Sequence, residues 1–279
     1  MLDDILANAK ERAKTPRPVH IRKWVWDSTK NSNMTWIWCE CIAWNKLPEW
    51  LCKPVTVVYN SKNGVTDRYH DQEEMNNAAR DTTDKFMDKS NLDRFLYESQ
   101  IEQEKLLQVA KDIEGLKTGG LPDEIIFKVY EILLNQYSEV CKYSNLAEIV
   151  KKEGEKRLEK FKTEEGKESE IIVIEERLKE IDVKKAQLQE TSDKTIEGTR
   201  KLFDELAKRT GQKISSVMVM SPEDIKFAIH TGKVEDWEIE GKMKHYIMVY
   251  DWEKIDPMVY TLEKARVMEL SFKFEKPAQ

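Results

Sequence analysis

Residues 71–210 carry the feature that most constrains the fold, because apolar side chains recur there at helical spacing over nearly the whole stretch. Leu92, Phe95 and Leu96 are one example of a spacing that places apolar side chains on one helix face. Glycine and proline number only 10 and 8 in 279 residues, so few positions interrupt a helix. Charged residues make up 35% of the chain, against about a quarter in an average protein. The pattern predicts a bundle of long helices with solvated outer faces.

Three places interrupt or weaken this helical pattern. At 116–124, Gly119 and Gly120 end one helix and Pro122 takes an early position in the next. At 151–170, seven positive and seven negative charges cancel, which fits either an exposed helix with many ion pairs or a flexible connection. Residues 171–206 show a partial heptad with polar residues on its seam, which favours antiparallel bundle helices with a break near Thr191–Asp193.

The segment before the bundle is rich in tryptophan. Six of the eight tryptophans lie within residues 24–50, and they are Trp24, Trp26, Trp36, Trp38, Trp44 and Trp50. The two-residue spacing within 24–26 and within 36–38 predicts strands, each with a tryptophan pair on one face. The polar run at 27–33 between them is typical of a turn.

A hairpin and a helix start follow the tryptophans. Residues 55–59 and 65–69 flank the turn SKNG, in which Gly64 suits a left-handed position. Asp71 is expected to begin a helix, with Glu74 three residues later as in a capping box.

The C-terminal quarter predicts a small α/β unit. Ser221 is expected to cap a helix, with Pro222 at its first position and Asp224 in its first turn. Residues 245–252 and 268–274 have strand-like patterns. We therefore expect a mainly helical α+β protein with three parts: an N-terminal helix plus Trp-rich β portion (1–70), a helical bundle (71–210) and a small α/β cap (211–279).

Composition and motifs argue against several protein classes. No run approaches the roughly 18 apolar residues of a membrane helix, and the N-terminus has no apolar signal-peptide core. Four cysteines are too few for a disulfide framework, so we expect a cytoplasmic protein. The net charge of −6 does not favour a nucleic-acid binder. No phosphate-binding loop, dinucleotide fingerprint or catalytic triad motif occurs, so we assign no catalytic residue and expect no cofactor.

Three groups of residues have alternative interpretations. The tryptophans either form the core of a small β unit or line an apolar pocket or partner groove. Cys39, Cys41 and Cys52 are most simply small buried residues, with a metal site as the alternative. Residues 10–23, which include Arg22, carry six positive charges and one negative charge. Next to aromatic residues, such a segment is compatible with weak single-stranded nucleic-acid binding through residues 10–50.

The order of pieces in 203–265 resembles a known enzyme family. FDELAKRTG, VMVMSPEDIKFAIHTGK, KHYIMVYDW and VYTLEKA follow one another with short connections. This resembles the region before the swivelling phosphohistidine domain of phosphoenolpyruvate-utilising enzymes of the phosphoenolpyruvate synthase type. The helical stretch 71–161 resembles the helical region that precedes it.

The resemblance implies a part of a phosphotransferase without a complete active site. The Gly-rich histidine loop and the ATP-grasp domain of the family are missing, and residues 260–262 read Tyr-Thr-Leu where relatives often have Tyr-x-Gly. It therefore implies a non-catalytic acceptor-binding or linker subunit or fragment, which works with a separate phosphohistidine carrier and an ATP-grasp subunit. By analogy the acceptor is an apolar or aromatic small molecule, bound at Trp24, Trp26, Trp36, Trp38, Trp44 and Arg22. The alternative is a helical interaction or scaffold protein without a ligand, which the mixed-charge helices and partial heptad favour.

Overall fold

The computed structural model describes residues 24–30, 34–48, 50–52, 55–231, 234–250, 257–272 and 274. Residues 1–23, with the expected N-terminal helix and the basic segment that includes Arg22, lie outside these residues, as do the side chains of Trp24 and Trp26. Within them the fold is mainly helical α+β, as predicted.

Among the described residues, one antiparallel sheet has the strand order β1-β3-β2-β4-β5. Its strands are β1 (Trp24–Lys30), β2 (Val57–Lys62), β3 (Val65–Asp71), β4 (His245–Tyr250) and β5 (Met258–Thr261). Because β2 pairs with both β3 and β4, strands from the N-terminal portion and from the C-terminal cap share one sheet. Only the tertiary fold brings these two segments of the chain together.

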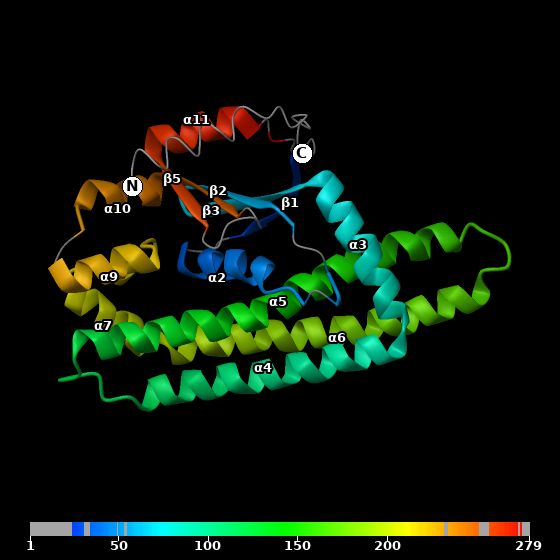
Figure 1. Cartoon of the computed structure of the whole chain (residues 1–279), viewed down its shortest axis with the longest axis horizontal. Coiled ribbons are helices and arrows are strands. Elements are labelled where there is room, and N and C mark those ends of the chain that lie inside the picture. The colour runs from blue at the N-terminus through cyan, green and yellow to red at the C-terminus, as the bar shows by residue number, and fades with distance from the viewer. Residues whose placement is uncertain are drawn as a thin grey trace, which may run out of the picture.

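The helices surround this sheet and extend beyond it (Figure 1). They are α2 (Met34–Asn45), α3 (Gln72–Met87), α4 (Lys89–Gly115), α5 (Asp123–Phe161), α6 (Glu168–Gly198), α7 (Arg200–Thr210), α8 (Ile214–Val217), α9 (Pro222–Thr231), α10 (Asp236–Lys244) and α11 (Leu262–Phe272). The long helices α4, α5 and α6 lie side by side as a bundle. The predicted break at 116–124 separates α4 from α5.

Both faces of the sheet are buried. Figure 1 shows α2 and the long helices on one side of the sheet and α11 on the other. Tyr59 and Met248 belong to the large core shared with α2 and the bundle. Their strand neighbours Val58 and Ile247 pack instead in the small cluster with Ala265 of α11. This explains the continuous apolar run in β4, which is typical of a strand buried on both faces.

The hairpin turn and two helix N-termini have the local structures that the sequence predicts. Asn63 and Gly64 both have positive φ, at 51° and 82°, as a two-residue hairpin turn requires. The Asp71 carboxylate accepts the Glu74 backbone N–H at 2.9 Å, and the Ser221 hydroxyl accepts the Asp224 backbone N–H at 3.2 Å. These side chains satisfy amide groups that a helix leaves unpaired at its start.

Residues 34–45 form a helix, so the predicted strand for the Trp36–Trp38 pair is wrong. Every described side chain from Met34 to Cys41 is buried. A helix buried on all sides loses the 3.6-residue pattern that marks a surface helix. A short, largely apolar run of this kind cannot be assigned to helix or strand by periodicity alone.

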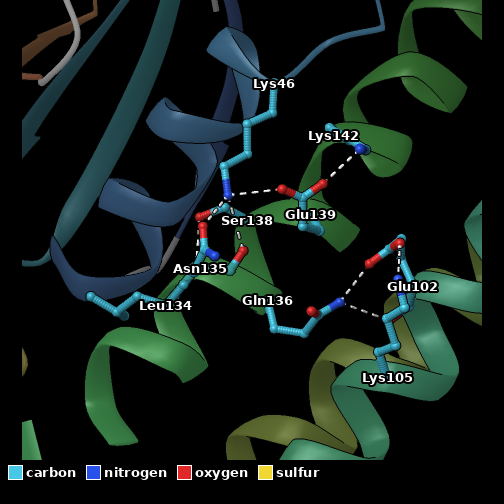
Figure 2. A network of polar contacts seen from close by, with 9 residues as sticks. All are labelled: Lys46, Glu102, Lys105, Leu134, Asn135, Gln136, Ser138, Glu139 and Lys142. Atoms are coloured by element: carbon cyan, nitrogen blue, oxygen red, sulfur yellow. Dashed lines mark hydrogen bonds and ion pairs between the residues drawn. The ribbon is translucent and has the colours of Figure 1, made fainter. Parts of the chain in front are cut away.

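A polar cluster fastens the end of α2 to α5 (Figure 2). The Lys46 ammonium pairs with Glu139 at 2.9 Å and donates to the carbonyl oxygen of Asn135 at 3.2 Å. Lys142 binds the other oxygen of Glu139 at 2.6 Å. Burial alone would raise the pKa of Glu139, but the hydrogen bonds from Lys142 and Lys46 keep it below its ordinary value. The same stretch of α5 contacts α4 through Gln136, whose Nε2 donates to Glu102 at 2.7 Å.

Two further local expectations are wrong. Residues 27–30 belong to β1, and 28–30 of them pair with β3, so the expected turn over 27–33 does not begin at residue 27. Residues 31–33 lie outside the described part. Residues 268–272 belong to helix α11 rather than to a strand. There Met268 and Phe272, one helical turn apart, pack with the cluster on the outer face of the sheet. The same stretch also shows apolar residues alternating with polar ones, at Met268, Leu270, Phe272 and Phe274. The helical and the strand periodicity are thus both present, and packing on the sheet selects the helix.

Helix α6 is continuous, so the predicted break near Thr191–Asp193 is wrong. The Oγ1 atoms of Thr191, Thr195 and Thr199 donate to carbonyl oxygens one turn earlier, at 2.7–2.9 Å. Gln103 of α4 also donates to the hydroxyl of Thr191 at 2.9 Å. Because these polar groups are satisfied, they occupy the buried seam without ending the helix.

The charge-balanced segment 151–170 divides between a helix and a turn. Helix α5 runs to Phe161, and α6 begins at Glu168. Lys151 pairs with Asp182 of α6 at 2.5 Å, one of several ion pairs along this part of α5. The helix alternative therefore holds for 151–161, and a short connection spans 162–167.

Candidate functional site

The most unusual chemical feature of the fold is a buried guanidinium held by three carboxylates. Arg68 lies on β3 and is 3% exposed. Its Nε donates to Asp27 of β1 at 2.5 Å, and its Nη1 donates to Glu40 of α2 at 2.5 Å. Its Nη2 lies 3.0 Å from Glu148 of α5. One side chain thus connects two strands and two helices.

A second cation completes this cluster, which we call the Arg68 ion cluster. Lys152, one turn after Glu148 on α5, pairs with Glu148 at 3.2 Å and also with Asp27. Three carboxylates thus face two cations. Burial alone would raise the pKa of Asp27, but Arg68 and Lys152 hold it well below its usual range. Burial lowers the pKa of the neighbouring His70 to about 4, so its imidazole is neutral at pH 7.

A bulge in β1 places Asp27 at this cluster. The pairing of β1 with β3 shifts between Trp26 and Ser28, so Asp27 has no directly opposed partner. A bulge of this kind redirects the side chain of the extra residue. The bulge therefore accounts for a carboxylate that reaches Arg68 on the adjacent strand.

A cavity of about 260 Å³ lies on one side of the cluster, between β1, β3, α3 and α5. We call it the sheet-side cavity. Its lining residues are Val25, Asp27, Arg68, His70, Gln72, Met75, Asn76, Ala79, Asn145, Glu148, Ile149, Lys152, Glu153 and Lys156. The polar lining and the Arg68 ion cluster make this a charged cavity.

A second cavity of about 490 Å³ lies between α2, α5 and α6, and we call it the bundle-side cavity. Its lining residues are Trp36, Glu40, Tyr137, Cys141, Ser144, Asn145, Glu148, Lys185, Gln189, Ser192, Asp193 and Ile196. The rings of Trp36 and Tyr137 meet at a centroid distance of 4.6 Å. Aromatic and polar side chains therefore both line this cavity, as in many small-molecule sites.

Asn145 and Glu148 line both cavities, so these residues of α5 form the partition between them. Asn145 is 4% exposed, and its Nδ2 has no hydrogen-bond acceptor among the described residues. A buried amide donor without a partner lowers stability by about 1–3 kcal/mol. The Nδ2 atom is itself buried, so the missing hydrogen bond belongs to the interior of the partition.

The predicted tryptophan site separates into different environments. Trp36 lines the bundle-side cavity. Trp38 and Trp44 are buried in the large core, where the Trp44 Nε1 donates to the Tyr59 hydroxyl at 3.4 Å. Trp50 stacks under the guanidinium of Arg94 at 4.1 Å. Trp36, Trp38 and Trp44 all belong to the large core that the sheet shares with the bundle, rather than to the core of a separate β unit, and Trp36 also lines the bundle-side cavity.

The three cysteines considered for a metal site face different partners. The thiol of Cys39 lies beside Ser138, that of Cys41 donates to Met248 Sδ at 3.3 Å, and that of Cys52 lies beside Thr82. Burial raises the pKa of Cys39 to about 12 and that of Cys52 to about 11, so both are protonated thiols at neutral pH in this structure. Among the residues with described positions, no group of three or more metal-binding side chains comes together.

Sequence reasoning missed the Arg68 ion cluster. The sequence signal for this cluster was the hairpin register, in which Arg68 stands opposite Tyr59. Arg68 therefore lies on the same inward face of the sheet as Tyr59. A charged residue at an inward position implies a buried partner. The identity of the partners was not available, because Asp27, Glu40 and Glu148 come from distant segments.

Comparison with known proteins returned no relative. No family model, no curated protein and no solved structure matches this chain. Among the described helices, none has both the length and the apolar composition needed to cross a membrane. The basic segment 10–23, on which the nucleic-acid alternative depends, lies outside the described residues.

Proposed function

We propose that this chain binds a small-molecule acceptor in the bundle-side cavity, as the acceptor-binding component of a cytoplasmic phosphotransferase of the phosphoenolpyruvate synthase type. The single observation that carries the binding role is a cavity of about 490 Å³ whose lining combines Trp36 and Tyr137 with polar side chains from α5 and α6. Its size lies in the range of about 300–1,000 Å³ that small-molecule sites occupy.

The phosphotransferase assignment rests on the sequence pattern at 203–265. Helix α7, helix α9 and strand β4 follow one another in the order that the resemblance implies, which supports the proposal. In this scheme the chain binds and orients the acceptor. A phosphohistidine carrier and an ATP-grasp subunit act as separate partners.

A ligand screen on the purified full chain tests the binding role. We would measure the melting temperature against hydroxyl-bearing aromatic, heterocyclic and alicyclic compounds, and confirm hits by calorimetry. Trp36→Phe removes part of the aromatic wall and is expected to weaken a genuine ligand about tenfold, since aromatic contacts contribute about 0.5–1.5 kcal/mol beyond their area. Trp50→Phe, which changes a tryptophan away from the cavity, is the matched control.

Affinity capture tests the phosphotransferase role. The tagged chain is expected to retain a protein that becomes phosphorylated on histidine by phosphoenolpyruvate or ATP. A library without a single Trp36-dependent ligand would overturn the binding role. Repeated capture from the native host without a phosphohistidine or ATP-grasp protein would overturn the phosphotransferase role.

A second candidate function, a helical interaction protein, is favoured by the outer face of α6. Ile172 and Val183 are 57% and 56% exposed on this helix, so a partner that covers them would bury apolar surface. Light scattering coupled to size-exclusion chromatography tests this function. A stable oligomer that Val183→Lys dissociates supports it, and a monomer at all concentrations overturns self-association.

A further inference from the structure

A groove of about 650 Å³ lies between α4 and α6, and it shares no lining residue with the bundle-side cavity. We call it the α4–α6 groove. Its apolar surface comes from Val183, which is 56% exposed, and from the half-buried Leu96. Its α6 wall runs from residue 176 to residue 187, which is about 16 Å along a helix. The groove therefore offers an elongated apolar surface.

Lys184 lines this groove and is a buried lysine without an ion pair. Its side chain is 6% exposed, and its Nζ donates to the Oε1 atoms of Gln100 at 3.2 Å and Gln103 at 3.1 Å. Gln103 is held in this orientation because its Nε2 donates to Thr191 at 2.9 Å. Among the described residues, no carboxylate forms an ion pair with the Lys184 ammonium. Buried charges are normally paired, so this ammonium lacks the counter-ion that its burial calls for.

One N–H of this ammonium is also left over. A lysine ammonium has three N–H donors, and the described residues accept two of them through Gln100 and Gln103. Burial lowers the pKa of Lys184, and Glu104 raises it from beyond ion-pair distance. An anion in the groove would accept the third N–H and offset the cost of burying the charge.

The remaining charges along the groove cancel, and they are those of Lys89, Arg177 and Lys179 against Asp93, Glu176 and Glu180. Lys89 and Arg177 both pair with Glu180, at 3.1 and 3.4 Å. The positive charge of Lys184 is therefore the one without a counterpart among the described lining residues. A negatively charged ligand is favoured over a neutral or positively charged one.

We infer that the α4–α6 groove binds a carboxylate with an aliphatic tail, such as a medium-chain fatty acid. The carboxylate accepts the free N–H of Lys184. The tail covers Leu96 and Val183, together with the methylene stems of the lysines beside them. This site is separate from the bundle-side cavity, so the inference goes beyond the proposed function.

Calorimetry on the purified full chain tests the inference, with decanoate well below its micelle-forming concentration as the probe. Three comparators each change one property of the probe. Acetate lacks the tail, 1-decanol lacks the charge, and decyltrimethylammonium reverses the charge. We expect one decanoate to bind per chain and each comparator to bind at least about tenfold more weakly, because only decanoate satisfies both the ammonium and the apolar surface.

Variants locate the binding. Lys184→Met keeps an unbranched stem and removes the ammonium, and it is expected to weaken decanoate about tenfold. Val183→Ser removes exposed apolar surface and is expected to weaken decanoate about fivefold. Because Val183 is exposed, this variant keeps the test valid if Lys184→Met does not fold. Lys194→Met is the matched control, since Lys194 lies on the same helix and pairs with Glu190 instead; it should leave the affinity unchanged.

Each contrary result overturns a stated part of the inference. Equal or tighter binding of 1-decanol or decyltrimethylammonium overturns the carboxylate class. Decanoate binding that neither Lys184→Met nor Val183→Ser weakens overturns the location. Light scattering that shows a dimer, dissociated by Val183→Ser and not by decanoate, would mean that a second copy of the chain occupies the groove, and this also overturns the inference. So does the absence of decanoate binding to the monomeric chain.

Discussion

Replacement of Arg68 by methionine tests whether the buried ion cluster is the structural link between the sheet and the helices. The substitution keeps an unbranched apolar stem and removes the charge that faces Asp27, Glu40 and Glu148. Two unit charges about 3 Å apart attract by about 5 kcal/mol at an effective dielectric constant of 20. Burial of the guanidinium offsets much of this attraction. We therefore expect Arg68→Met to lower the free energy of unfolding by about 3–5 kcal/mol, as when one partner of a buried pair is removed.

The pH dependence of this loss provides a second readout. In the wild type, the folded-state pKa of Asp27 is depressed, so its stabilisation is present above the unfolded pKa and is lost as the pH falls through the folded value. In the variant, the carboxylates stay buried with only Lys152 nearby, so their folded-state pKa values rise above those of the unfolded chain. Protonation then stabilises the variant. The stability difference should shrink as the pH falls from 7 towards about 4.5.

Urea unfolding followed by circular dichroism at several pH values measures both quantities. Arg80→Met is the matched control, because Arg80 is exposed and donates to Asn76 and Asn77 of its own helix. It should change stability by less than about 0.5 kcal/mol. An Arg68→Met variant that loses less than about 1 kcal/mol at pH 7, or whose loss does not depend on pH, would refute the reasoning.

Three other predictions concern local features. Asp71→Ala removes the cap of α3 and should lower stability by about 1 kcal/mol, measured as a shift of the urea midpoint; an unchanged midpoint would contradict the cap's role. Lys46→Met should raise the pKa of Glu139, because one of its two cations is lost, and NMR titration of that carboxyl would show no rise if the contact is absent in solution. Cys141 is the one partly exposed thiol among the four, so a thiol reagent at pH 8 should modify it first in the native protein. Rapid modification of Cys39 would contradict the burial that raises its pKa to about 12.

The two strand errors share one physical cause. Residues 34–45 and 268–272 contain apolar side chains at a spacing of two, but they also contain a spacing of three or four. Where one periodicity is weak or both are present, packing decides between helix and strand. Helix α2 is buried on all sides between the sheet and α5, and α11 lies on the outer face of the sheet. Neither environment is visible in the segment's own sequence.

The candidate site was predictable only in part. Trp36 was identified from composition, and it lines the bundle-side cavity. Arg68 was detectable as a charged residue on an inward-facing position of a confirmed hairpin. The carboxylates that hold it were not predictable, because many Asp and Glu residues occur along the chain and none is distinguished by spacing.

What the sequence by itself determined is local: the hairpin with positive φ at Gly64, the caps at Asp71 and Ser221, and the long helices between them. These depend on backbone conformation and on hydrogen bonds between residues a few positions apart, which short stretches of sequence encode. The tertiary structure alone decided the sheet that joins β2 to β4 and the convergence of charges on Arg68. Both depend on burying apolar surface and charge between segments far apart in the chain, and such contacts form only when the whole fold is in place.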